Sequence, residues 1–163
     1  MRRIVTGHGE DGRSKVVTDE SVAHHNFGDS GCHGWAIWGR DDAPTFPDDG
    51  AEPPTTGSFP PIGGCRASVM RLAPGRTEAF DRFVADNLVQ YADPAIAGMH
   101  RTPSLDFDIV VSGHVFLQLD EGEVELGPGD IVVQNGTNHR WINRSDEDVT
   151  VAVVVVGARD AAE

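Results

Sequence analysis

The sequence predicts an all-β protein, a sandwich or barrel assembled from short strands. From residue 100 onward, runs rich in Val, Ile, Leu and Phe alternate with turns such as "DEG", "GPGD" and "NGT". Short apolar runs separated by Gly, Pro, Asp and Asn turns at this spacing are typical of such folds. The expected strands lie within 106–113, 115–120, 123–126, 130–134, 139–143 and 149–157.

The first 75 residues add further strands and one long connection. Residues 2–7 and 13–19 predict two short strands around a Gly-rich turn, and 34–39 and 65–75 predict two more. Residues 41–64 hold six of the ten prolines and five acidic residues, a composition typical of a surface loop. We expect an ordinary connection there, with a lid over a pocket as the alternative.

One helix is expected, over residues 77–92. Thr77 stands where a side chain can cap the first turn. Apolar side chains recur at near-helical spacing, and we expect them to pack on the sheet. They are Phe80, Phe83, Val84, Leu88 and Tyr91.

Length and charge bound the class of protein. The 163 residues fit a single domain, and the formal net charge is −13, with Lys15 the one lysine. An acidic surface without basic clusters argues against nucleic acid and anionic membranes as partners. A single lysine also makes Schiff-base chemistry a poor hypothesis.

The opening residues carry two arginines but no apolar run of signal-peptide length, which favours a cytoplasmic protein. No apolar run approaches the roughly 20 residues that span a bilayer. Cys32 and Cys65 are expected to stay reduced in that compartment, and their spacing matches neither a zinc nor a redox motif. Residues 23–35 contain three histidines and Cys32, also without zinc spacing, and are expected to form a solvated loop.

Polar residues alternate along the stretch 100–108. Because strand side chains alternate between faces, His100, Thr102, Ser104, Asp106 and Asp108 share one face. The simplest interpretation is that this face meets water. The valines and isoleucine that follow predict instead a strand buried on both faces from about residue 109, with one face lining the lumen of a small barrel.

Two motifs in this region resemble those of the cupins. The first cupin motif runs His-x-His, three or four residues, Glu, six residues, Gly. Here it reads His100, Thr102, Asp106 and Gly113, with Thr for the second His and Asp for Glu. The second motif reads Gly129, then Gln134 one residue early in the Pro place, Gly136, His139 and Asn143.

The resemblance implies a cupin-type β-barrel, also called a double-stranded β-helix or jelly roll, with N-terminal strands and one short helix. It covers 65–158 as the barrel, preceded by strands and the Pro-rich acidic loop in 1–64, all within a single domain, 1–163. The residues of the two motifs are most similar to those of a bacterial and fungal subgroup of single-domain cupins. Cupins often form homodimers through N-terminal strands, a role the resemblance would give to residues 2–7.

Carried over position by position, the resemblance implies that His100, Asp106 and His139 are metal ligands. Two imidazoles and one carboxylate suit Fe(II), Mn(II), Ni(II) or Zn(II) and leave positions open for substrate. The alternatives are a metal-free pocket in which the histidines and a carboxylate act as acid and base, or a pocket that only binds a ligand.

Asp108 adds a second carboxylate on the same face. Two carboxylates in a confined lumen repel, which raises the pKa of one of them and makes a general acid at neutral pH. The alternative is a local bulge that turns Asp108 outward. Thr102, Gln134 and Trp141 are candidates for substrate contact, although Trp141 is expected chiefly to fill the barrel.

These residues favour a small-molecule enzyme with non-redox acid–base or metal-assisted chemistry on a small organic acid or ketone. Decarboxylation, dehydration and isomerisation are the expected reaction types. An Fe(II)-dependent dioxygenase and a non-catalytic ligand-binding cupin are the alternatives. An anionic substrate would need a cation in the lumen, for which Arg66, Arg71 and Arg101 lie nearest in sequence.

Overall fold

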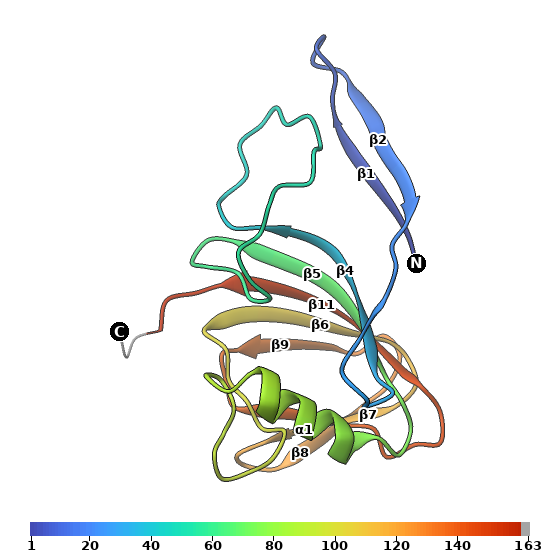
Figure 1. The fold of residues 1–163 in the computed structure, drawn as a ribbon, viewed down its shortest axis with the longest axis vertical. Helices are drawn as coiled ribbons and strands as arrows, with labels where there is room; N and C mark the ends of the chain where they lie inside the picture. The colour runs from blue at the N-terminus through green and yellow to red at the C-terminus, as the bar shows by residue number, and fades with distance from the viewer. Residues whose placement is uncertain (161–163) are drawn as a thin grey trace.

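The computed structural model describes residues 1–160 and builds them mainly from β-strands (Figure 1). The larger sheet has the order β3 (His25–Asn26), β4 (His33–Arg40), β5 (Cys65–Leu72), β11 (Val149–Gly157), β6 (Ser104–Ser112) and β9 (Ile131–Asn135). The smaller sheet has the order β10 (His139–Ile142), β7 (Val115–Leu119) and β8 (Glu123–Leu126). A separate hairpin of β1 (Arg2–His8) and β2 (Ser14–Ser21) extends from the body. The predicted all-β class is confirmed.

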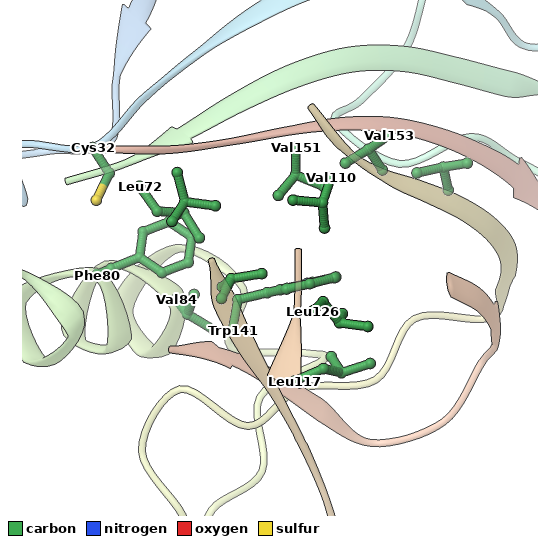
Figure 2. Close-up of a cluster of buried hydrophobic side chains, with 13 residues drawn as sticks. Cys32, Leu72, Phe80, Val84, Val110, Leu117, Leu126, Trp141, Val151 and Val153 are labelled. Carbon is green, nitrogen blue, oxygen red and sulfur yellow. The ribbon is translucent and has the colours of Figure 1, made fainter. Parts of the chain in front are cut away.

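The hydrophobic core lies between the two main sheets (Figure 2). Val110, Val151 and Val153 of the larger sheet pack toward Leu117 and Trp141 of the smaller one, and each is at most 8% exposed. The same cluster includes Cys32, Leu72, Phe80 and Val84. Two sheets that bury their inner faces against each other close the molecule as the barrel that the motifs imply.

The helix is shorter than the periodicity predicts. Helix α1 spans Thr77–Asn87, and the chain beyond it turns so that Ala92 forms a bridge with His100. This pairing overrides the helical pattern of 88–92. The predicted cap is wrong, because Arg76 occupies the N-cap position without a side-chain bond, while the Thr77 hydroxyl lies 3.4 Å from the carbonyl of Asn143.

Strand β6 alternates as predicted, with its polar face turned inward. Asp106 and Asp108 are 7% and 3% exposed, so the interpretation of this row as water-facing is wrong. The prediction of burial on both faces from residue 109 is also wrong, since Ile109 is 39% and Val111 is 55% exposed. The outer face of β6 is therefore apolar and open, and the inner face polar and buried.

The N-terminal hairpin is held to the body by hydrogen bonds to backbone carbonyls. The His8 amide donates to the Asp48 carbonyl at 2.8 Å, and Arg3 Nη1 donates to the Ile37 carbonyl at 2.9 Å. Pairing of two copies through this hairpin stays a prediction. In the part of the chain that the structure describes, no helix has the length and apolar character needed to cross a membrane.

Residues 23–35 differ from the expected solvated loop. They contain β3, which pairs with β4, and Cys32, which is 2% exposed within the core. His24 and His33 lie side by side with ring centroids 4.8 Å apart. The segment packs because Phe27 contacts Phe80 and Phe83 of α1, a tertiary contact that local composition does not indicate.

Candidate functional site

A cavity of about 520 Å³ opens inside the barrel and is lined by strands of the larger sheet and by helix α1. Its lining includes the polar residues His100, Thr102, Asp106, Asp108 and His139. Most of the remaining wall is apolar. Its aromatic members are Phe27, Trp38, Phe59, Phe80, Phe83 and Trp141. The arrangement is that of a small-molecule site, an apolar hollow with a few convergent polar groups.

The two carboxylates occupy alternate positions on the inner face of β6. Burial raises the pKa of Asp108 to about 7, and repulsion from Asp106 adds to the shift. Burial also raises the pKa of Asp106, against an opposing hydrogen bond from Ser104. The bulge that would turn Asp108 outward is absent from β6 at this position, where Asp108 pairs in regular register with Val132 and Val153.

The two histidines form a cross-strand pair. The amide of each donates to the carbonyl of the other, at 3.0 Å from His100 and 2.9 Å from His139, and their ring centroids lie 4.4 Å apart. Burial lowers the pKa of both rings, and that of His139 falls to about 4 with a further contribution from His100. Both rings are therefore neutral at pH 7.

The tautomer of each ring follows from its hydrogen bond. His100 Nδ1 lies 3.0 Å from the Gly98 carbonyl, and His139 Nδ1 lies 3.0 Å from the Thr137 carbonyl. A carbonyl oxygen can only accept, so each Nδ1 carries the proton. Each Nε2 is left with a lone pair, the state that binds a metal ion or accepts a proton.

The donor set fits a metal ion in part. The two Nε2 atoms are suitable ligands, and Asp106 Oδ1 is buried without a hydrogen-bond partner. Yet within residues 1–160 no three His, Cys, Asp or Glu side chains are grouped closely enough to hold a metal ion. The ligand set His100, Asp106 and His139 therefore stays a prediction.

The three residues predicted to contact substrate lie in different places relative to the cavity. Thr102 lines the cavity and its hydroxyl is 2.7 Å from that of Ser104. Trp141 lines the cavity and is also part of the core, 5% exposed. Gln134 is buried outside the cavity lining, where its amide donates to the carbonyl of Thr137, 3.0 Å away. It thereby holds the carbonyl that orients His139.

Sequence reasoning missed most of the aromatic wall. Phe80 and Phe83 were assigned to core packing, and Phe59 to the Pro-rich connection. Residues 55–59 of that connection reach the cavity, and Phe59 contacts Tyr91 with ring centroids 5.0 Å apart. The available signal was the presence of large apolar side chains in an otherwise polar loop.

Comparison with known proteins relates part of the chain to a known family. Residues 87–156 match the model described as a cupin domain. The match covers less than half of the 163 residues. The cupin domain of Schizosaccharomyces pombe Cnp3 has the same fold, with a TM-score of 0.55 over 99% of this chain and 98% of that one, at 8% identity.

Two similar relatives are fungal. A cupin-domain-containing oxidoreductase of Aspergillus ruber is 29% identical over 143 residues, 86% of this chain and 63% of the relative. The phomopsin biosynthesis cluster protein C′ of Diaporthe leptostromiformis is 54% identical over 48 residues, 29% of this chain and 25% of the relative. The chain thus spans less than two thirds of the length of either relative.

Proposed function

We propose that this protein is an enzyme that moves protons on a small carbonyl compound held in the barrel cavity. Isomerisation, dehydration and decarboxylation are the reaction types that this chemistry includes. One observation carries the proposal: two neutral imidazoles and two carboxyl groups line the same, mostly apolar cavity. A barrel that served only as a scaffold would gain nothing from burying these groups.

The acid and base roles follow from the environments of the two carboxyl groups. In an isomerisation, the Asp106 carboxylate takes a proton from the carbon beside the carbonyl while the Asp108 carboxyl gives its proton to the carbonyl oxygen. The product of this step is the neutral enol, with Asp106 protonated and Asp108 ionised. In the second step protonated Asp106 gives its proton to a different carbon, and the enol hydroxyl returns its proton to the ionised Asp108. This gives the isomer and restores both groups.

The histidine pair contributes lone pairs to the same cavity. Its Nε2 atoms accept hydrogen bonds from a substrate hydroxyl or enol, which fixes the orientation of the reacting carbon. A low-dielectric cavity strengthens these contacts relative to water. Asp108, with its pKa near 7, supplies a general acid suited to neutral pH.

An oxidoreductase is the second candidate. The Aspergillus ruber relative carries that description, and the unprotonated Nε2 atoms are the kind of ligand that Fe(II) takes. An Fe(II)-dependent dioxygenase would consume oxygen only when substrate and Fe(II) are both supplied. Oxygen uptake that is independent of substrate, or absent with Fe(II), argues against this candidate.

The test of the leading proposal is exchange of carbon-bound protons. Aryl ketones are incubated with the protein in D₂O, and loss of the proton signal beside the carbonyl is followed by NMR. We expect exchange above the rate in buffer, reduced about a hundredfold or more by Asp108→Asn or by joint His100→Gln and His139→Gln replacement. His114→Gln, at an exposed histidine outside the cavity lining, is the control. Exchange unaffected by the cavity variants would contradict the proposal.

A further inference from the structure

The polar residues that line the cavity carry hydrogen-bond acceptors that meet no donor. Asp106 Oδ1 is buried without a partner, and the Nε2 atoms of His100 and His139 receive no hydrogen bond from residues 1–160. A buried acceptor left without a donor costs free energy comparable to a lost hydrogen bond. The buried Asp106 Oδ1 therefore favours a ligand that brings a donor of its own, and the two Nε2 atoms are further acceptors for it.

The cavity offers no available cation to an anionic ligand. Among the described residues that line it, Arg66 is the one Lys or Arg side chain. Its Nη2 pairs with Asp41 at 2.5 Å, its Nε donates to the Gly57 carbonyl at 3.1 Å, and its Nη1 donates to two further backbone carbonyls. All three guanidinium nitrogens are thus engaged within the protein.

Arg71 and Arg101, the other two arginines near the polar residues in sequence, form ion pairs outside the cavity lining. Arg71 pairs with Asp148 and its side chain is 44% exposed, while Arg101 pairs with Asp160 and is 54% exposed. Neither lines the cavity. An organic anion in the cavity would instead meet the Asp106 carboxylate, which repels it at short range.

The apolar wall determines the shape and polarity of the ligand beyond its donor group. Phe27 lies 5.7 Å from Phe80 and 5.2 Å from Phe83 between ring centroids, and Trp38 and Phe59 contribute rings from other elements. Aromatic rings prefer offset or edge contacts with other rings and bury a large area. A flat aromatic body fits this wall better than a sugar or another strongly hydrated molecule.

We propose that the cavity binds a neutral aromatic molecule bearing a hydroxyl group, of the phenol or hydroxyaryl ketone class, and rejects carboxylates of the same size. The hydroxyl donates to Asp106 Oδ1 or to an Nε2 atom, and the ring packs among the aromatic side chains. The inference rests on the site of the proposed function and narrows its substrate from carbonyl compounds in general to neutral ones. Of the three reaction types it leaves isomerisation and dehydration and excludes decarboxylation.

Three probes that share one ring system test the inference by calorimetric titration. 2-Naphthol carries the donor, 2-methoxynaphthalene lacks it, and 2-naphthoate carries a negative charge. We expect 2-naphthol to bind about tenfold or more tightly than either of the others, since both leave a buried acceptor without a donor. Equal or tighter binding of 2-methoxynaphthalene or 2-naphthoate, or no binding of 2-naphthol, would overturn the proposal.

Two substitutions assign the preference to Asp106. Asp106→Leu removes the acceptor, so 2-naphthol should lose its advantage over 2-methoxynaphthalene. Asp106→Asn keeps the shape and removes the charge, so the penalty on 2-naphthoate should fall even if the leucine variant does not fold. Asp42→Asn, at an aspartate whose side chain is 82% exposed, should change neither ratio. Unchanged ratios in the Asp106→Asn protein would contradict the assignment.

Metal content is measured on the same samples. Tight 2-naphthoate binding that disappears after EDTA treatment would mean that a cation occupies the acceptors, which overturns the inference. The preference among probes is independent of turnover. Preferential binding of 2-naphthol without proton exchange in any ketone would contradict the proposed function alone, whereas exchange together with preferred carboxylate binding would contradict this inference alone.

Discussion

Asp81 and Arg140 form a two-contact ion pair between helix α1 and strand β10. Arg140 Nε lies 3.1 Å from Asp81 Oδ1, and Nη2 lies 2.5 Å from Oδ2. The Asp81 side chain is 4% exposed, and Arg140 directly follows His139 in the chain. The pair therefore fixes the helix that forms one wall of the cavity to the strand that carries one of its histidines.

Removal of the cation from this pair should be costly. In Arg140→Met the Asp81 carboxylate stays buried without its partner, and we expect the free energy of unfolding to fall by about 3 to 5 kcal/mol. Urea denaturation measures the change. Arg2→Met, which breaks the exposed pair with Asp19, is the control and should leave stability almost unchanged. A loss no larger than that of the control would show that the buried pair contributes little.

Gly98 cannot carry a side chain in this structure. It has φ +82°, and an added Cβ would lie 2.0 Å from Asp81 Oδ1. Gly98→Ala should cost the left-handed strain of about 1 to 2 kcal/mol and a further 1 to 3 kcal/mol, roughly, for the overlap. Gly75 also has a positive φ, +62°, but an added Cβ there would meet nothing within 4 Å. Gly75→Ala therefore measures the backbone strain without the overlap. Equal urea midpoints for the two variants would contradict the close contact.

The Asp108 carboxyl should make stability depend on pH. Its pKa is about 7 in the folded protein against 3.8 for the free side chain, so between these values the native state binds more protons than the unfolded state. This group therefore favours folding at low pH, and its contribution declines by up to about 1.4 kcal/mol per pH unit as pH rises toward 7. His139 acts in the opposite sense between about 4 and 6.5, because its pKa is lowered on folding.

The two contributions are separated by substitution. Asp108→Asn removes the part of the pH dependence that comes from Asp108. The parent protein loses this stabilisation between pH 5 and pH 7 and the variant does not. The free energy of unfolding of the variant, minus that of the parent protein, should therefore increase over this range. Urea denaturation at intervals of half a pH unit measures this difference. A difference that is constant with pH would mean that Asp108 does not titrate in this range.

Metal binding should be weak. Two imidazoles face each other, but no third His, Cys, Asp or Glu in residues 1–160 joins them in one group. We expect dialysis against EDTA to leave far less than one equivalent of transition metal, with no change in the urea midpoint. Retention of one equivalent by the parent protein and its loss in His139→Ala would contradict this expectation and support the three-residue site.

The sequence predicted the fold and the polar row more fully than the cavity. Period-two alternation placed Asp106 and Asp108 on one face, because it depends on local strand geometry. The resemblance to the two cupin motifs, and not local geometry, placed His100 and His139 at one site. The cavity wall depends on contacts between segments far apart in the chain, such as Phe27 with Phe83. Whether the outer face of β6 is covered also depends on distant segments, and for that reason the burial of Ile109 and Val111 was predicted wrongly.

The most direct test of the account is the state of the two histidine rings. In ¹⁵N-labelled protein at pH 7, with signals assigned from His100→Gln and His139→Gln, we predict that both Nδ1 atoms carry a proton and both Nε2 atoms do not. Addition of 2-naphthol should shift the two Nε2 signals. A proton on either Nε2 would contradict a cavity in which both lone pairs are free to receive the substrate.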